Sequence, residues 1–152
     1  STVPGLGPRH LAYAKDGNTA YLAYELGNVV SVLRAQDAGW VCVQTLSTLP
    51  EQAQGESSVA AVRVTDTQVM VSNRGHDSIA VFERLPDGLL RRTHIAAVPG
   101  KFPRDFALLD DGRMLVAQQD AGGVAYLQWT GDRLTPCCAP LPIAGAVCVC
   151  LG

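Results

Sequence analysis

This sequence has no excess of positive charge: 12 Lys+Arg stand against 14 Asp+Glu, a net charge of −2. Surfaces that bind nucleic acid or anionic membranes need a cationic surplus, so the composition argues against both partners. Only 17% of the residues are charged and 47% are hydrophobic, which argues against extended disorder. The longest uncharged run, residues 134–152, holds Pro136, Pro140 and Pro142 and is therefore unfit to cross a membrane as a helix.

Several signals of location and chemistry are also missing. No basic segment followed by an apolar one opens the sequence, so nothing indicates secretion and we expect a cytoplasmic protein. The sequence contains no serine nucleophile elbow, zinc-binding helix motif, phosphate loop or dinucleotide fingerprint. We therefore expect chemistry without a metal, a cofactor or a covalent serine intermediate.

The cysteines do not form a recognisable framework. Their odd number and irregular spacing argue against paired disulfides. Thiolate zinc sites typically use cysteine pairs separated by about two to four residues. In this sequence Cys137 and Cys138 are adjacent, and a single residue separates Cys148 from Cys150. We expect small buried side chains in a reduced compartment and no metal site. The cysteines are Cys42, Cys137, Cys138, Cys148 and Cys150.

Short β-branched segments are what the sequence does contain, with turn residues about every ten positions. This pattern predicts consecutive antiparallel strands in three sets of four. The predicted strands are 11–14, 20–24, 29–33 and 40–46, then 60–64, 69–72, 79–83 and 89–95, then 106–109, 114–118, 124–129 and 134–139.

The three sets repeat by position. Pro8-Arg9 and Pro103-Arg104 open two of the units, and each arginine is followed seven residues later by Asp-Gly. Four strands per unit at this period predict an all-β propeller, with a generic antiparallel meander as the alternative. The predicted units are 7–56, 57–101 and 102–145, with residues 146–151 as a closing strand. Because propellers have about four to eight blades, we expect about three blades of a larger ring whose missing N-terminal blades precede Ser1.

Strand register predicts which side chains meet. In a four-stranded meander, the start of the first strand and the turn between the second and third strands lie at the same end. We call this end the rim, and the sequence places three arginines, a lysine and two histidines there. These cations would attract a small anion, because guanidinium groups bind carboxylate or phosphate through two hydrogen bonds. The alternative is that the arginines are solvated or paired with carboxylates, and that the histidines bond to the backbone. The expected rim residues include Arg9, His10, Glu25, Arg74, His76, Lys101, Arg104 and Gln119.

Five segments of the sequence resemble one known family. They are residues 7–11 (GPRHL), 24–26 (YEL), 44–50 (QTLSTLP), 72–82 (SNRGHDSIAVF) and 102–106 (FPRDF). They resemble the lactonase family of seven-bladed β-propellers, which includes bacterial 6-phosphogluconolactonase and the fungal carboxymuconate lactonizing enzyme. Tyr24, Ala61 and Gln118 depart from the family pattern, which usually has Asn, Asp and Asn there.

The resemblance implies hydrolysis of a sugar or sugar-phosphate lactone, as in the pentose phosphate pathway, or related muconate lactone chemistry. It places Arg9, Glu25 and Arg74 at the family's proposed catalytic positions. We assign substrate binding to His10, His76, Lys101, Arg104 and Gln119. The family's proposed catalytic histidine belongs to an earlier blade, outside this sequence.

Two other readings stay open. The rim could bind anions or a protein partner without turnover, since propellers often act as docking platforms. The 152 residues alone are expected to be an incomplete, inactive fragment, because the ring and part of the site are absent.

Overall fold

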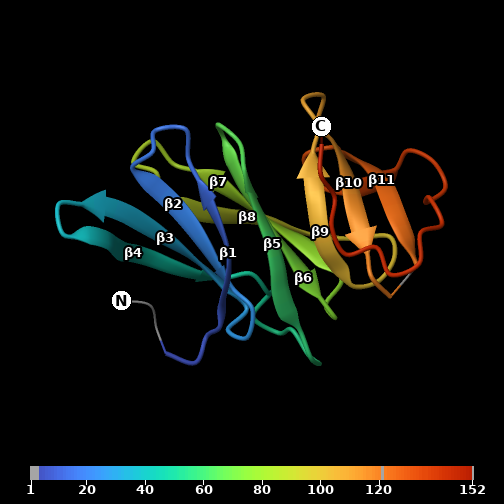
Figure 1. The fold of residues 1–152 in the computed structure, drawn as a ribbon, viewed down its shortest axis with the longest axis horizontal. Helices are drawn as coiled ribbons and strands as arrows, with labels where there is room; N and C mark the ends of the chain where they lie inside the picture. The colour runs from blue at the N-terminus through green and yellow to red at the C-terminus, as the bar shows by residue number, and fades with distance from the viewer. Residues whose placement is uncertain (1–3, 121, 152) are drawn as a thin grey trace.

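The computed structural model describes residues 4–120 and 122–151 and places twelve strands in three antiparallel sheets (Figure 1). The first sheet contains β1 (Pro8–Tyr13), β2 (Thr19–Tyr24), β3 (Val29–Gln36) and β4 (Gly39–Ser47). The second contains β5 (Ser58–Val64), β6 (Gln68–Arg74), β7 (Ser78–Arg84) and β8 (Leu90–Ala97). The third contains β9 (Pro103–Leu108), β10 (Arg113–Gln118), β11 (Gly123–Trp129) and β12 (Leu134–Pro136).

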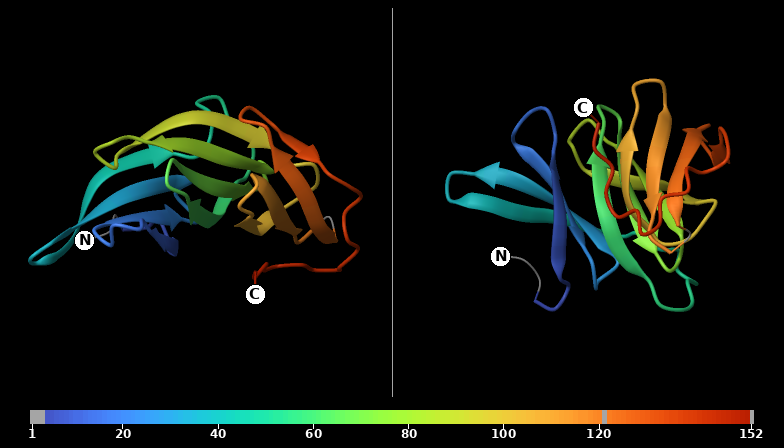
Figure 2. Two further views of the ribbon diagram at one scale, coloured as in Figure 1. Left: turned by 90° about the horizontal axis from the view of Figure 1, so that it is seen from above. Right: turned by 45° about the vertical axis from the view of Figure 1, so that its right-hand side comes forward.

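Each sheet is a meander in which neighbouring strands follow one another in the chain. The sheets succeed one another along an arc, with β1, β5 and β9 on its concave side (Figure 2). β1 packs against β5, and β5 packs against β9. This arrangement of four-stranded sheets is that of propeller blades. The predicted all-β, partial-propeller fold is confirmed.

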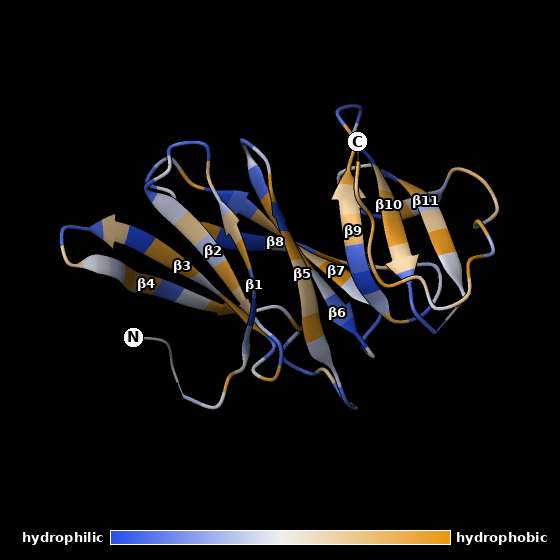
Figure 3. Cartoon of the chain, in the orientation of Figure 1, coloured by the Kyte–Doolittle hydropathy of each residue, from blue (hydrophilic) through white to orange (hydrophobic). Residues whose placement is uncertain are grey.

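Two apolar layers hold the blades together. One lies between the first and second sheets and includes Tyr21 and Phe82, both fully buried. The other lies between the second and third sheets and includes Phe106 and Met114, also fully buried. Figure 3 shows the apolar bands on the strands and the more polar connecting turns. Burying each large side chain contributes roughly 1.5–3 kcal/mol, so these layers fix the positions of the inner strands relative to one another.

The C-terminal part departs from the prediction. The strand expected over 134–139 ends at Pro136, where the continuous ladder with β11 stops, and an isolated bridge between Val124 and Leu141 follows. The closing strand expected over 146–151 does not form: no residue there is in a strand. A ladder needs the backbone of a neighbouring strand, and the Val149 N–H instead donates to the Asp105 carboxylate at 3.1 Å.

The predicted boundaries between units fall in the segments that join β4 to β5 and β8 to β9. Within the described ranges, the structure has no helix of the length and apolar character needed to span a bilayer.

Candidate functional site

The start of β1 and the turn between β2 and β3 lie at one end of the first sheet, as strand register predicts. The Glu25 N–H donates to the Gly7 carbonyl at 2.7 Å. The Glu25 carbonyl in turn accepts from the Val59 N–H at 3.1 Å. These backbone bonds join the start of β1 to the start of β5 and hold the Glu25 side chain at the rim between the first two sheets.

Glu25, Arg74 and Arg9 form an ion cluster at this rim. Arg74 Nη2 pairs with Glu25 Oε1 and also donates to the Val59 carbonyl at 3.1 Å. Arg9 Nε lies 3.7 Å from Glu25 Oε2. The Arg74 side chain is buried, whereas that of Glu25 is 38% exposed. The cluster therefore presents a water-accessible carboxylate held by a buried cation.

The charges around this cluster favour an ionised Glu25. The hydrogen bond from Arg74 lowers the pKa of Glu25 most. Burial, the second-largest effect, raises this pKa, and the charges of Arg74, Arg9 and Arg104 lower it further. Burial chiefly lowers the pKa of Arg9, aided by Arg74 and opposed by Glu25. Two guanidinium groups thus contact one carboxylate and the charge of Arg104 also acts on it, and this positive excess suits an anionic ligand.

Arg9 and His10 also serve the fold. Arg9 Nη1 donates to the Ala60 carbonyl at 2.5 Å, and His10 Nδ1 lies 3.4 Å from the Val62 N–H. Both backbone groups belong to β5, whose inner edge has no neighbouring strand in its own sheet. The alternative that a histidine bonds to the backbone describes one contact of His10, and the alternative that an arginine pairs with a carboxylate describes the contact of Arg9 with Glu25.

Within the part of the chain that the structure describes, the other predicted site residues form no side-chain hydrogen bond or ion pair with the Glu25, Arg74 and Arg9 cluster. Arg104 Nη1 donates to Gln119 Oε1 at 2.8 Å, which pairs two of them at the start of the third sheet. His76 Nδ1 lies 2.8 Å from Ser78 Oγ, a contact within its own turn. Lys101 is exposed ahead of β9. Their assignment to substrate binding stays a prediction.

Phe102 is a rim residue that strand register did not single out. The Arg74 guanidinium lies over its ring, 5.4 Å from the centroid. Its backbone has φ of 59°, a rare conformation for a bulky residue that is typical of functional sites. The Asp77 carboxylate holds it by accepting from the Phe102 N–H at 2.8 Å. The sequence signal was the aromatic residue directly before Pro103-Arg104.

A hollow of about 560 Å³ opens beside this pair. Arg74 and Phe102 line it, together with Asn28, Glu56 and Ser57 among others. It is large enough to receive part of a small ligand next to the ion cluster.

Arg63 and Asp105 form a second ion pair that the sequence did not reveal. Arg63 Nη2 lies 2.5 Å from Asp105 Oδ1, and the pair spans β5 and β9. Arg63 lies inside the strand predicted over residues 60–64, and strand register alone assigns it no role at the rim. Only the packing of β5 against β1 and β9 shows that this side chain lies beside His10.

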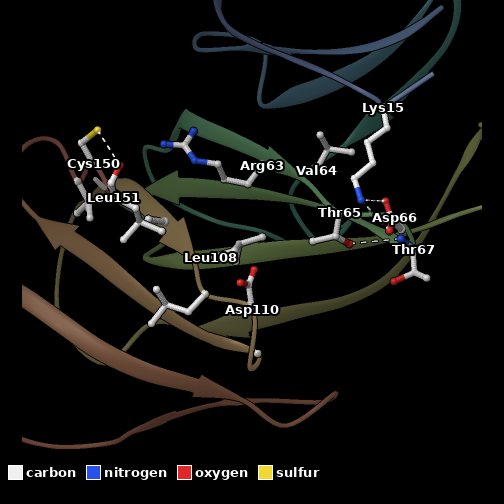
Figure 4. Close-up of a pocket in the computed structure, with 14 residues that line it drawn as sticks. Lys15, Arg63, Val64, Thr65, Asp66, Thr67, Leu108, Asp110, Cys150 and Leu151 are labelled. Atoms are coloured by element: carbon white, nitrogen blue, oxygen red, sulfur yellow. Dashed lines mark hydrogen bonds and ion pairs between the residues drawn. The ribbon is translucent and has the colours of Figure 1, made fainter. Parts of the chain in front are cut away.

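A larger hollow, of about 770 Å³, lies toward the opposite end of the inner strands (Figure 4). Lys15 and Asp66 pair at one side of it, and Arg63, Asp110 and Leu151 also line it. None of Arg9, Glu25 and Arg74 reaches it. We place the candidate site at the rim, because the ionised groups converge there. Over the described part of the chain, no group of three or more His, Cys, Asp or Glu side chains could hold a metal ion.

Comparison with known proteins agrees with this geometry. The family described as "Lactonase, 7-bladed beta-propeller" matches residues 1–151. An uncharacterised protein of Staphylococcus epidermidis is 43% identical over 132 residues, covering 85% of this chain and 39% of that protein. The periplasmic gluconolactonase of Pseudomonas aeruginosa superposes with a TM-score of 0.86 and 29% identity, over 95% of this chain and 42% of its own. A proposed 6-phosphogluconolactonase of Bacteroides fragilis superposes with a TM-score of 0.85 and 28% identity, over 97% of this chain and 42% of its own.

The chain spans about two fifths of the length of these relatives. Three consecutive blades account for that share of a seven-bladed ring. The repeated units, the stacked sheets and the match over nearly every residue lead to one conclusion: the chain is a partial propeller that belongs to the lactonase family of seven-bladed β-propellers.

Proposed function

We propose that the protein containing this chain hydrolyses a lactone, most simply a sugar or sugar-phosphate lactone. The observation that carries the proposal is an ionised, partly exposed Glu25 held between Arg74 and Arg9. Family membership supports it, as do structural neighbours named gluconolactonase and proposed 6-phosphogluconolactonase.

In the proposed reaction, a water oxygen forms a bond to the lactone carbonyl carbon. The water gives up a proton, the bond from that carbon to the ring oxygen breaks, and the ring oxygen takes up a proton in place of the one that the water lost. Arginine stabilises the negative charge that develops on the carbonyl oxygen. Glu25 accepts a hydrogen bond from the attacking water and orients it. Its lowered pKa suits this orienting role better than the role of a base that takes up and holds the proton of the water.

The excess of arginine at the rim supports an anionic substrate. Arg104 lies close enough to lower the pKa values of both Glu25 and Arg9 by its charge, although the hydrogen bond from Arg74 and burial, respectively, are the largest causes. Its paired Gln119 adds a polar side chain beside it. We assign these two residues to a phosphate or carboxylate substituent, because guanidinium groups bind such oxygens in pairs.

The remaining part of the ring belongs to the same proposal. Since the chain spans about two fifths of its relatives, we infer that further blades of the same protein complete the channel and supply the catalytic histidine that the family resemblance implies. On its own, the chain is then inactive.

A pH-stat assay of the full-length protein tests the function. Proton release from glucono-δ-lactone and from 6-phosphogluconolactone is followed and corrected for spontaneous ring opening. We expect acceleration of at least one, with the phosphorylated compound preferred. No acceleration of either compound, or of a muconate lactone, would overturn the proposal.

A binding propeller without turnover is the second candidate. It is favoured by the backbone bonds of Arg9 and Arg74 to the Ala60 and Val59 carbonyls, which give these arginines a role in joining blades. Calorimetric binding of 6-phosphogluconate, together with an absence of lactone turnover, would select this candidate.

A further inference from the structure

The Arg63–Asp105 pair connects four segments of the chain on the concave side of the arc. Asp105 is 8% exposed. Its Oδ1 accepts from Arg63 and, at 2.9 Å, from the Phe106 N–H, while its Oδ2 accepts from the Val149 N–H. Arg63 also donates to the Val62 carbonyl at 3.0 Å. Both partners are thus held in place by several bonds each.

Arg63 is in turn placed against His10 on β1. Its Nη1 lies 3.2 Å from His10 Nε2 and 3.5 Å from His10 Nδ1. Nearly equal distances to both ring nitrogens put the guanidinium across the face of the imidazole. An in-plane bond would instead favour one nitrogen. The ring plane is therefore left free for other hydrogen bonds.

The tautomer of His10 follows from its other contact. The Val62 N–H faces Nδ1 at 3.4 Å, and a backbone N–H can only donate. Because the Arg63 guanidinium lies across the ring face, the Val62 N–H is the donor that we place in the ring plane. We therefore take Nδ1 as the unprotonated acceptor, which leaves the proton of the neutral ring on Nε2.

The surroundings disfavour a charged ring. Burial lowers the pKa of His10 most, and the Arg63 and Arg9 charges lower it further, whereas Asp105 opposes them. Arg63 and Val62 come from β5, Asp105 from β9 and Arg9 from β1 itself. Burial of the ring, together with a cation directly against it, makes protonation unfavourable.

We propose that Arg63 and Asp105 are positioning residues that fix His10 as a neutral imidazole whose Nε2–H donates to an uncharged oxygen of the substrate. The proposal rests on the proposed lactone hydrolysis. Asp105 orients Arg63, and Arg63 orients the ring and keeps it neutral. His10 then adds an uncharged donor beside the arginines, suited to a hydroxyl or carbonyl oxygen. Through Val149, the C-terminal segment supports the same arrangement.

Nitrogen-15 NMR of histidine in the resting, full-length protein tests this. The signals of His10 are assigned as those that disappear from the spectrum of the His10→Gln variant. We expect Nδ1 to have the shift of an unprotonated acceptor and Nε2 that of an N–H. A protonated Nδ1 in the neutral ring would overturn the proposal, and this result requires no variant at Arg63 or Asp105 to fold.

The two variants give opposite expected shifts. Arg63→Met removes a cation and should raise the pKa of His10 by about one pH unit, whereas Asp105→Asn removes an anion and should lower it. Loosened packing alone would raise it in both variants, because burial would be lost. Shifts of the same sign, or none, would therefore overturn the positioning role.

Matched controls are Arg91→Met and Asp111→Asn, which remove the same charges from exposed ion pairs. We expect the pKa of His10 to be unchanged in both. Because NMR reads the resting protein, a protein that shows these shifts and hydrolyses no lactone would refute the proposed function and not the positioning of His10.

Discussion

At the scale of single residues, Glu25 and Arg74 differ in what solvent can reach. Arg74 is buried against backbone and an aromatic ring, so its charge depends on Glu25 for compensation. Glu25 keeps 38% of its side chain exposed and can still contact water. Removing Glu25 thus strands a buried cation, whereas removing Arg74 frees a solvated carboxylate.

Acid titration should reveal this pairing. The pKa of Glu25 is lowered in the fold, first by the Arg74 hydrogen bond. Its stabilising contribution is therefore present above the unfolded pKa, about 4.3, and is lost as pH falls through the lowered folded pKa. We expect the stability difference between wild type and Glu25→Gln, measured by urea unfolding of the full-length protein, to shrink on acidification from pH 7.

The control for this titration is Glu83→Gln, at an exposed pair with Arg91. It should show little difference from wild type at any pH, because exposed pairs contribute little. A Glu25→Gln difference that stays constant down to pH 3 would contradict the ion pairing.

Gly75 follows Arg74 in a turn that requires glycine. Its φ is +84°, and a Cβ there would collide with the Glu56 carbonyl oxygen. Gly17 has φ of +69° with open space around it. We expect Gly75→Ala to destabilise the protein by about 1–3 kcal/mol and by more than Gly17→Ala, as measured by chemical denaturation. Equal effects would show that the contact with Glu56 relaxes without cost.

At the scale of strands, the sequence located the elements better than their ends. Alternating β-branched residues and Asp-Gly turns predicted three sets of four strands. β5 starts at Ser58 and not at residue 60, because Ser58 and Val59 still pair with the end of β6 and the Val59 N–H also donates to the Glu25 carbonyl. β12 stops early at Pro136. Such ends depend on partners far along the chain, which local pattern does not contain.

The candidate site was predictable to the extent that it depends on strand register. Arg9, Glu25 and Arg74 occupy repeated positions at one end of their blades, so the period alone places them on one rim. Phe102 and Arg63 were not predicted to face ligands. The positive φ of Phe102 and the packing of Arg63 on His10 are tertiary features without a local signal.

The packing between blades should respond to a core truncation. Phe106 on β9 is fully buried in the layer between the second and third sheets. We expect Phe106→Ala to destabilise the protein by about 3–5 kcal/mol, as measured by thermal or denaturant unfolding. Leu26→Ala, at a side chain 70% exposed, should change stability by less than about 0.5 kcal/mol. Similar effects of both would contradict the blade packing.

At the scale of the whole molecule, the first sheet has an open flank. Leu11, Tyr13 and Trp40 are 38%, 54% and 39% exposed. The Tyr13 and Trp40 rings contact each other edge to face, with centroids 5.6 Å apart. Large exposed apolar groups gathered on one sheet face usually mark a contact surface. In the ring we propose, a preceding blade covers this flank.

Light scattering tests whether this exposed flank causes self-association. We expect residues 1–152 alone to self-associate, and Leu11→Lys with Tyr13→Lys to reduce that association. In the full-length protein, the same double substitution should lower the free energy of unfolding, because the flank is then buried. A compact monomer of residues 1–152, with full-length stability unaffected by the substitutions, would contradict the open ring.

The central proposal is that the Arg9, Glu25 and Arg74 cluster performs lactone hydrolysis. The most direct test is the turnover of a sugar lactone by the full-length protein carrying Arg74→Ala or Glu25→Gln, with Arg91→Ala as the matched control. Loss of one positioned donor typically lowers turnover on the order of 10²–10³-fold, and we expect losses of that order in the first two variants and none in the third. Turnover by Arg74→Ala and Glu25→Gln equal to that of wild type would contradict the account.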